Sequence, residues 1–277
     1  MIPEIDIEKK ISTERFVEIF KTYKCALLIN IIQNDEQKII EQWLENVKEY
    51  FAQDTITKNK IPHDPYRNIG YQFMHRVSTP IERYHFYKNR MNDSDWDKVI
   101  NKDLALQVVD IYERITVKML KLFDLALDSD TQLVDAHKQA WNTTAVMHYH
   151  PVQENVEYTR GNPHYDWGTI TFFWQLEKGG LEMNHADRTW HHVQEKENSV
   201  AVCIGKTLQR WSNDFFQSTL HRVHNNYLSS SRYSMPHFVV PQPGTVIKNI
   251  TQNKDIYAPI TIDELLPQIS NNNVIIS

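Results

Sequence analysis

The chain has 277 residues, of which 41% are apolar, 11% aromatic and 23% charged, a composition ordinary for a soluble globular protein. Its 30 basic and 35 acidic residues give a formal net charge of -5, so a nucleic-acid partner is not expected, because like charges repel. No run reaches the roughly 18–20 apolar residues of a membrane span, and no signal peptide is expected at the first residues. The two cysteines make no disulfide framework, and we expect a reducing cytoplasm.

The sequence pattern of the first half of the chain predicts mostly helices with little extended structure. A short apolar run at 26–29 favours a buried strand. Apolar residues then recur with a 3.6-residue period over 39–51, after a helix-capping sequence at 34–36, and this pattern predicts a helix. The same period predicts a long helix over 103–127, followed by a shorter helix over 130–138.

Residues 53–100 are rich in charge and aromatic side chains, and we expect loops there with one strand near Tyr71. Loops above a rigid scaffold commonly carry specificity. The stretch 58–76 is therefore a candidate substrate lid, with Arg67 and Tyr71 as candidate substrate contacts.

The pattern changes after Asn142 to short apolar runs separated by turn signals, and a short helix is expected over 208–213. Closely spaced short strands after a helical segment predict a β-sandwich or barrel. The predicted strands cover 145–149, 169–174, 181–183, 190–193, 200–204, 219–223 and 233–240.

A set of potential metal ligands lies among these strands. His164 and Asp166 are two residues apart, and alternate side chains of an extended chain point to the same side. A third ligand must come from elsewhere, and His221 lies 55 residues after Asp166 inside a predicted strand. Two imidazoles and one carboxylate form the facial triad of non-haem iron(II) oxygenases, which leaves coordination sites open.

A second motif follows eleven residues after His221. Arg232 and Ser234 would share one face of a strand. A guanidinium offers a planar fork for a carboxylate, and the hydroxyl adds a further donor. The distal carboxylate of 2-oxoglutarate would satisfy a buried arginine that has no acidic neighbour in the sequence.

Three segments together resemble the isopenicillin N synthase-like branch of the Fe(II)/2-oxoglutarate-dependent dioxygenases. They are HYDWGTITFFWQLEKGGLEM, IGKTLQRWSNDFFQSTLHRV and RYSMPHFVVP, and the resemblance covers residues 148–241 in one order and spacing. The N-terminal part is similar more loosely, through IPEIDI, a strand near Leu27 and Gly70-Tyr71. The chain departs from the family pattern at three places. Residues 203–206 read CIGK where NIGD is common, and Ala145 stands where an arginine is common. At 195–198 the sequence EKEN replaces a proline–glycine turn.

The resemblance implies a mainly β fold with flanking helices, in which a distorted double-stranded β-helix (a cupin-like jelly roll) forms the core. We therefore expect an N-terminal helical module over 1–141, the jelly-roll domain over 142–245 and a C-terminal extension over 246–277. The resemblance also implies iron ligation by His164, Asp166 and His221, and 2-oxoglutarate binding by Arg232 and Ser234. Tyr149 matches a position that often contacts the co-substrate.

The implied activity is that of an oxidoreductase that uses Fe(II), 2-oxoglutarate and dioxygen to oxidise a C–H bond of a small molecule. Hydroxylation, desaturation or ring closure would accompany release of succinate and carbon dioxide. Two alternatives remain from the residues alone. One is an iron oxidase of the same fold that does not use 2-oxoglutarate, and the other is a jelly-roll binding protein or a zinc hydrolase with the same three ligands.

Several other residues near these motifs have simpler interpretations. Phe238 is in phase with Arg232 and is a candidate substrate contact. His148 and His150 are expected at a strand edge, and His237 is expected to face outward. Trp167 is expected in the core.

Overall fold

The computed structural model describes residues 1–33, 36–65, 67–75, 80–151, 161–176, 179–224 and 229–271, with the side chains of residues 75 and 267–271 left aside. The predicted helix cap at 34–35 lies outside the described residues. The strands are β1 (Glu4–Asp6), β2 (Cys25–Ile29), β3 (Gly70–His75), β4 (Pro80–Phe86), β5 (Thr143–Tyr149), β6 (Gly161–His164), β7 (Ile170–Gln175), β8 (Leu181–Asn184), β9 (Trp190–His192), β10 (Ser199–Ile204), β11 (His221–Val223), β12 (Arg232–Val239), β13 (Val246–Ile247) and β14 (Ile260–Thr261). The helices are α1 (Thr13–Thr22), α2 (Glu36–Ala52), α3 (Thr55–Lys58), α4 (Lys102–Leu127), α5 (Gln132–Ala136), α6 (Lys206–Trp211) and α7 (Ile262–Asn271), with a 3-10 turn at Asp93–Asp95.

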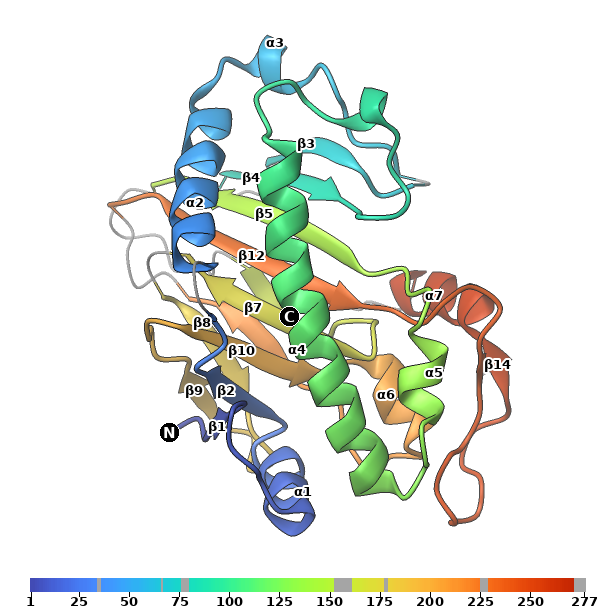
Figure 1. Cartoon of the computed structure of the whole chain (residues 1–277). Coiled ribbons are helices and arrows are strands. Elements are labelled where there is room, and N and C mark those ends of the chain that lie inside the picture. The colour runs from blue at the N-terminus through green and yellow to red at the C-terminus, as the bar shows by residue number, and fades with distance from the viewer. Residues whose placement is uncertain are drawn as a thin grey trace.

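Two sheets form the centre of the molecule (Figure 1). The larger sheet has eight strands in the order β1-β2-β10-β7-β12-β5-β4-β3, and the smaller has four in the order β6-β11-β8-β9. Neighbouring strands of both sheets are antiparallel except β1 and β2. The strands of the N-terminal half, β1 to β4, therefore extend the same large sheet that β5, β7, β10 and β12 build.

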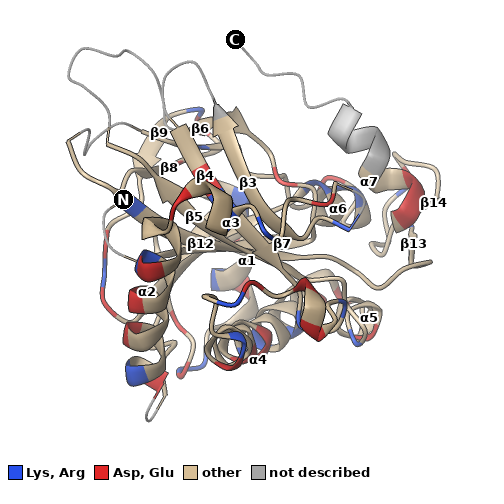
Figure 2. Ribbon diagram, turned by 90° about the horizontal axis from the view of Figure 1, so that it is seen from above, with Lys and Arg blue, Asp and Glu red and all other residues tan. Residues whose placement is uncertain are grey.

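The large sheet has two chemically distinct faces, because successive side chains of a strand point to opposite sides. We call the face that packs on the helices the outer face, and Tyr84, Val146 and Phe172 belong to its core cluster. We call the opposite face the inner face. It contributes Ala201 and Cys203 to a cluster with residues of β8, and other inner-face residues pack on β11. In Figure 2, α2 and α4 lie on one side of this sheet and β6, β8 and β9 on the other.

Helix α4 is the main support of the outer face. It begins after Asn101, whose side chain accepts a hydrogen bond from the Leu104 amide, and ends at Asp128 in the left-handed conformation. One apolar stripe of the helix is buried, and the Tyr112 hydroxyl donates to the Met235 carbonyl in the large sheet at 2.5 Å. This helix and α2 confirm the two long helices predicted from the 3.6-residue period.

The structure corrects several other expectations from the sequence. Helix α1 and strand β4 were not predicted, although Ser12 caps α1 in the usual way. His237 does not face outward into solvent: it is fully buried and stacks on Tyr112 with ring centroids 4.5 Å apart. Trp167 does not belong to the core, because 40% of its surface is exposed.

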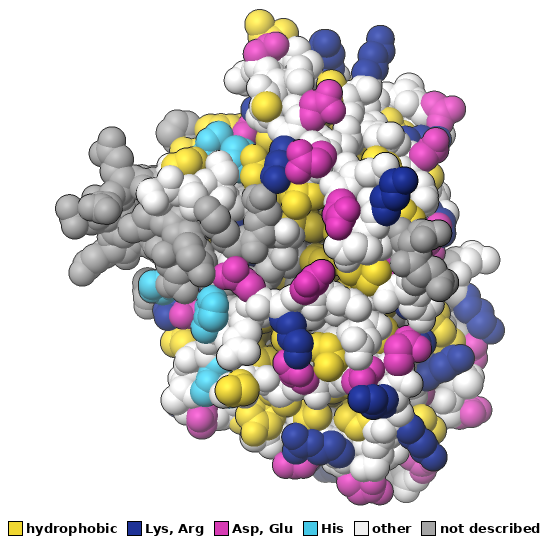
Figure 3. All heavy atoms as spheres, turned by 60° about the vertical axis from the view of Figure 1, so that its left-hand side comes forward, with side chains coloured by type: hydrophobic (Ala, Val, Ile, Leu, Met, Phe, Trp, Pro, Cys, Tyr) yellow, Lys and Arg dark blue, Asp and Glu magenta, His cyan; other side chains and the backbone are white. Residues whose placement is uncertain are grey.

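The surface carries both signs of charge. Acidic and basic side chains are interspersed over the face that Figure 3 shows, in keeping with the nearly balanced composition. Within the described ranges, no helix combines the length and apolar character needed to cross a membrane.

Two glycines hold the start of β7 close to the end of β10. A Cβ atom on Gly205 would lie 2.0 Å from the Gly168 carbonyl oxygen, and a Cβ atom on Gly168 would lie 2.5 Å from the Val239 oxygen. The Lys206 amide donates to the Asp166 carbonyl at 2.8 Å beside this approach. The close contact therefore fixes the backbone of Asp166.

Gly205→Ala is expected to destabilise the protein by about 1–3 kcal/mol, because overpacking against backbone cannot be relieved by a side-chain rotation. Thermal unfolding measures the effect. Gly161→Ala is the matched control, since its Cβ would meet only ordinary contacts at 3.4–3.6 Å from Val223. Equal melting temperatures for both variants would contradict the assigned role of the Gly168–Gly205 approach.

Candidate active site

Two histidines on neighbouring strands of the smaller sheet and one aspartate just beyond β6 converge. His164 ends β6, His221 begins β11, and the register pairs these two residues directly. Asp166 follows two residues after His164. Its Oδ1 lies 3.6 Å from His164 Nε2, and its Oδ2 lies 3.6 Å from His221 Nε2. The structure thus brings together the three residues predicted as metal ligands.

The backbone orients both imidazoles toward this centre. His164 Nδ1 lies 2.8 Å from the Asn162 carbonyl oxygen, and His221 Nδ1 lies 3.2 Å from the Thr219 carbonyl oxygen. A carbonyl oxygen only accepts hydrogen bonds, so each Nδ1 carries a proton and each Nε2 is left as the nitrogen that can bind an ion. This is the arrangement by which outer partners fix the tautomer of a metal-binding histidine.

The centre leaves buried polar atoms without partners. His221 is 1% exposed, and neither its Nε2 nor Asp166 Oδ2 has a hydrogen-bond partner among the described residues. A separation of 3.6 Å is too long for a hydrogen bond. Burial lowers the pKa of His221 to about 4, although Asp166 acts in the opposite direction, so the ring is neutral at pH 7.

These unsatisfied atoms fit a cation. Two atoms each about 2.1 Å from one ion lie at most about 4.2 Å apart, so separations of 3.6 Å allow a shared ion. Two neutral imidazoles and one carboxylate are a donor set that suits first-row transition metals. A buried orphaned polar atom is costly, and a bound cation would remove that cost at Asp166 and His221.

A cationic fork lies on the inner face of β12. Arg232 is 2% exposed, donates from Nε to the Gly179 carbonyl at 2.6 Å and from Nη1 to Ser234 Oγ at 3.1 Å. Its guanidinium carbon lies 4.7 Å from the centre of the Tyr149 ring, and the register pairs Arg232 with Tyr149. Burial lowers the pKa of Arg232, but guanidinium remains protonated in proteins.

The charge of Glu195 helps to keep this fork protonated, without forming an ion pair with it. Among the residues that the structure describes, no carboxylate forms an ion pair with Arg232. A buried cation is costly without an anionic partner. The arrangement can therefore take a carboxylate, with Ser234 as an additional donor.

The fork and the triad face the same region between the sheets. Val223, two residues after His221 on β11, packs with Tyr149 in one apolar cluster. Phe173 on β7 belongs to the inner-face cluster, and its ring centroid lies 4.9 Å from that of His221. One small molecule that chelates an ion at the triad can thus extend toward Arg232.

The three predicted substrate contacts have different surroundings. Phe238 is half-buried and lies on the inner face, in phase with Arg232. Tyr71 is buried, and its hydroxyl donates to Glu82 Oε1 at 2.5 Å. Arg67 forms an ion pair with Asp95 at 2.5 Å. Phe238 therefore lies on the face of the large sheet that is turned toward the triad. Tyr71 and Arg67 instead contact Glu82 and Asp95.

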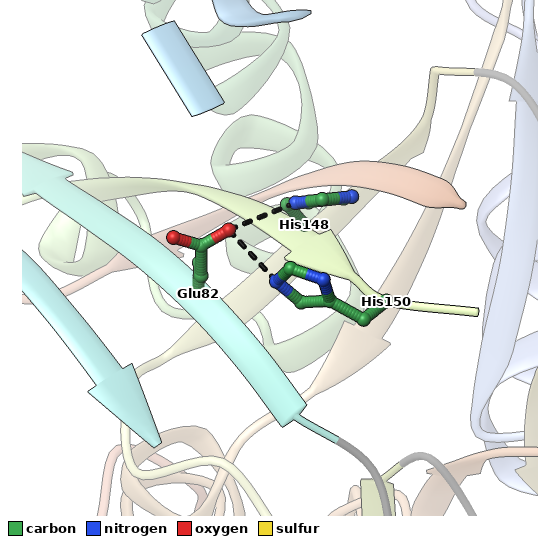
Figure 4. Close-up of side chains that lie close together, drawn as sticks. All are labelled: Glu82, His148 and His150. Atoms are coloured by element: carbon green, nitrogen blue, oxygen red, sulfur yellow. Dashed lines mark hydrogen bonds and ion pairs between the residues drawn. The ribbon is translucent and has the colours of Figure 1, made fainter. Parts of the chain in front are cut away.

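A second cluster of ligand-type side chains lies on the outer face and was not predicted. Figure 4 shows Glu82 of β4 pointing toward His148 of β5 and toward His150, which directly follows β5. Glu82 Oε2 accepts from His148 Nδ1 at 3.1 Å and from His150 Nε2 at 2.8 Å. Its Oε1 accepts from Tyr71 and from the buried ammonium of Lys58.

This cluster differs from the triad in being satisfied by its own members. Glu82 accepts four hydrogen bonds, and His148 Nε2 meets Ser231 Oγ at 2.9 Å. Lys58 already neutralises the carboxylate, so a divalent ion would add uncompensated buried charge. The Glu82 cluster is therefore a polar network that joins α3, β3, β4 and β5, and the triad is the better candidate metal centre.

Comparison with solved structures identifies the class of the fold. The structure resembles that of a full-length Neurospora crassa protein in complex with alpha-KG and thymine, with a TM-score of 0.85, 22% identity, and coverage of 96% of this chain and 95% of that one. A putative 2OG-Fe(II) oxygenase family protein of Caulobacter crescentus matches with a TM-score of 0.82, 24% identity, and 98% coverage of both chains. The predicted double-stranded β-helix with flanking helices is confirmed.

Sequence comparison then relates the central segment to a known family. Residues 141–241 match the model of the 2OG-Fe(II) oxygenase superfamily. A 2-oxoglutarate-Fe(II) type oxidoreductase of Emericella nidulans is 30% identical over 166 residues, which are 56% of this chain and 47% of that protein. A feruloyl CoA ortho-hydroxylase of Ipomoea batatas is 38% identical over 103 residues, 36% of this chain and 28% of that protein. The chain thus matches less than half the length of these two relatives, and the predicted isopenicillin N synthase-like branch is consistent with the superfamily.

The Glu82 network predicts a pH-dependent stability. Burial alone would raise the pKa of Glu82, but hydrogen bonds from His148, His150, Lys58 and Tyr71 together lower it well below its ordinary value. The ionised carboxylate therefore stabilises the fold at neutral pH. This contribution is lost as the pH falls from the ordinary glutamate pKa of about 4.3 toward the lower folded-state pKa.

Glu82→Gln is expected to lower the free energy of unfolding at pH 7 by about 3–5 kcal/mol, because it leaves the Lys58 charge buried and unpaired. The difference from the unmodified protein should shrink below pH 4, as urea unfolding at several pH values measures. Glu182→Gln is the matched control, since Glu182 pairs with the partly exposed Arg222. A pH-independent deficit in Glu82→Gln would rule out the ionised network.

Proposed function

We propose that the chain is an Fe(II)/2-oxoglutarate-dependent oxygenase that oxidises a C–H bond of a small molecule and releases succinate and carbon dioxide. The observation that supports this most is the combination of an unsatisfied His-Asp-His centre with a buried arginine that forms no ion pair among the described residues. Neither feature alone points to a single ligand. A bidentate metal ligand with a distal carboxylate satisfies both features together, and 2-oxoglutarate is such a molecule.

In this proposal His164, Asp166 and His221 hold the iron, and the bound ion supplies the reaction with dioxygen. The protein contributes orientation and electrostatics, as is general for cofactor enzymes. The carbonyls of Asn162 and Thr219 keep both imidazoles in the tautomer that presents Nε2 to the centre. The buried position of Asp166 and His221 limits the access of water to that side.

Arg232, Ser234 and Tyr149 bind the distal carboxylate of 2-oxoglutarate. The guanidinium supplies charge-assisted hydrogen bonds, and the Ser234 hydroxyl adds another donor. Tyr149 lies against the guanidinium through a cation–π contact, and Gly179 holds Nε, so the fork is fixed before the co-substrate binds. This preorganisation favours a planar carboxylate over a spherical anion.

We further propose that the substrate is a small organic molecule bound between the sheets, with Phe238 as one contact. The Neurospora crassa protein that shares the fold was crystallised with thymine and with 5-formyluracil, and both are small molecules. The match at 141–241 supports a catalytic unit over 142–245, flanked by an N-terminal module over 1–141 and an extension over 246–277. Both cysteines are buried and unpaired, in keeping with a reducing cytoplasm.

The proposal is tested by measuring release of labelled carbon dioxide from 2-oxoglutarate that carries the label at carbon 1. An iron oxidase that does not consume 2-oxoglutarate would release none. Asp166→Ala should reduce release by more than about 100-fold, since loss of a ligand exceeds the effect of losing an outer partner. Arg232→Met should raise the KM for 2-oxoglutarate by about 100-fold or more, because a buried charge pair is lost.

Arg15→Met is the matched control, because Arg15 pairs with Glu18 on the exposed face of α1. Its kinetics should equal those of the unmodified protein. Iron-dependent substrate oxidation without labelled carbon dioxide would refute 2-oxoglutarate as co-substrate. Full turnover in Asp166→Ala, with iron still bound, would refute the ligand assignment.

A further inference from the structure

A buried histidine on β4 faces the same side as the candidate active site. On this strand Ile81 packs with Tyr149 and Val223 on the inner face, whereas Tyr84 belongs to the outer-face core. His85 is four residues after Ile81, so strand alternation places it on the inner face. Glu82, three residues before His85, points the other way, toward His148 on the outer face (Figure 4).

The ring of His85 is buried without hydrogen bonds. It is 4% exposed, and neither Nδ1 nor Nε2 has a partner among the described residues. The residues paired with it across the strands are Gly70 and Ala145, whose side chains carry no polar atom. A neighbouring ring is that of His63, with centroids 5.5 Å apart. Two unsatisfied nitrogens on one buried side chain are unusual in native proteins.

The charge state of His85 defines what it can bind. Burial, with smaller contributions from the charges of Arg83 and His63, lowers the pKa of His85 well below its ordinary value. The ring is therefore neutral and offers one N–H donor and one nitrogen acceptor. A neutral ring with a free N–H complements a polar group that carries an acceptor oxygen, whether that group is uncharged or anionic.

Arg83 adds positive charge on the same face. Its Nε donates to Gln72 Oε1 at 2.7 Å, and this contact orients the guanidinium. The register pairs Arg83 with Met147 and Met147 with Ser234 of the proposed co-substrate site. Two strand spacings place the Arg83 backbone about 10 Å from that of Ser234. A small molecule beside 2-oxoglutarate can span this distance.

A second buried histidine shows what a structural role looks like. His237 lies on the outer face, where its Nδ1 meets Thr144 Oγ1 at 2.8 Å and its ring stacks on Tyr112. Neighbours thus hold His237 by a hydrogen bond and a stacked ring. His85 has no comparable hydrogen bond in the described part of the chain.

We propose that His85 is a specificity-determining residue, which donates its ring N–H to a carboxylate or carbonyl oxygen of the substrate. The field of Arg83 favours an oxygen that carries full or partial negative charge. The substrate class is therefore a small organic acid or amide, with the oxidised carbon held toward the triad. This inference rests on the proposed function of the same site, which it deepens.

The first test measures the stability of the metal-free protein. His85→Leu should melt at the same or a higher temperature, because the substitution removes two unsatisfied buried nitrogens. His237→Leu should melt several degrees lower, because it loses a hydrogen bond and a stacked ring. A melting temperature for His85→Leu as low as that of His237→Leu would overturn the proposal, since His85 would then have a structural role.

The second test measures binding with defined probes, again without metal. The ¹⁵N signals of the His85 ring, assigned by their loss in His85→Asn, should shift on addition of acetate, benzoate or benzamide and not of toluene. A shift of the His85 signals with benzoate alone indicates that His85 binds a carboxylate of the substrate. A shift with benzamide as well indicates that it binds a carbonyl oxygen. Absence of any shift at tens of millimolar, or an equal shift with toluene, would overturn the proposal.

The third test uses the iron-loaded enzyme with a panel of small acids, amides and their hydrocarbon counterparts. His85→Leu should reduce kcat/KM for acids or amides by about 10–100-fold, and His85→Asn by less, because one hydrogen bond to substrate is worth that much. His237→Leu should change kcat/KM by less than about threefold. The visible absorption of the iron–2-oxoglutarate complex should persist in all variants. Its absence in the unmodified protein would refute the proposed function alone, whereas unchanged specificity in His85→Leu would refute the role of His85.

Discussion

Antiparallel pairing of β11 with β6 places His221 directly opposite His164, and the chemistry proposed for the chain depends on this one register. A shift of β11 by one residue would turn His221 to the other face of the sheet and separate it from His164. The pairing also sets the position of Asp166, which lies two residues beyond β6. The backbone at Asp166 is held by the close contact between Gly168 and Gly205. The large sheet then supplies the second half of the site, because β12 presents Arg232 and Ser234 toward the same region.

Hydrogen-bond satisfaction distinguishes the buried polar clusters of this protein better than residue type does. The triad and the Glu82 cluster each contain two histidines and one carboxylate. Glu82 is surrounded by donors, including the ammonium of Lys58, and so it stabilises the fold without a ligand. Within the described ranges, Asp166, His221 and His85 retain unpartnered atoms at a cost in stability, and these atoms lie on the side where the substrates are proposed to bind. The satisfied Glu82 cluster and the unsatisfied triad thus lie on opposite sides of the large sheet.

The sequence predicted those parts of the fold and site whose signals are local. The period of apolar residues located α2 and α4, and the two-residue spacing of His164 and Asp166 located the candidate metal centre. Strand β4 was missed because its buried Glu82 and His85 break the apolar alternation of a strand. The partners that allow Glu82 to be buried are 24 residues away at Lys58 and 66 residues away at His148, and only the fold brings them together. The hydrogen bond of Tyr71 to Glu82 has no sequence signal for the same reason.

The proposed function depends on one ferrous ion at the end of β6 and a dicarboxylate that reaches Arg232. The most direct measurement is a crystal structure grown anaerobically with Fe(II) and 2-oxoglutarate, with anomalous data collected at the iron edge. One iron peak bonded to His164, Asp166 and His221 is expected, with the distal carboxylate of 2-oxoglutarate on Arg232 and Ser234. An iron peak at Glu82, His148 and His150 with an empty triad, or a 2-oxoglutarate molecule away from Arg232, would contradict it.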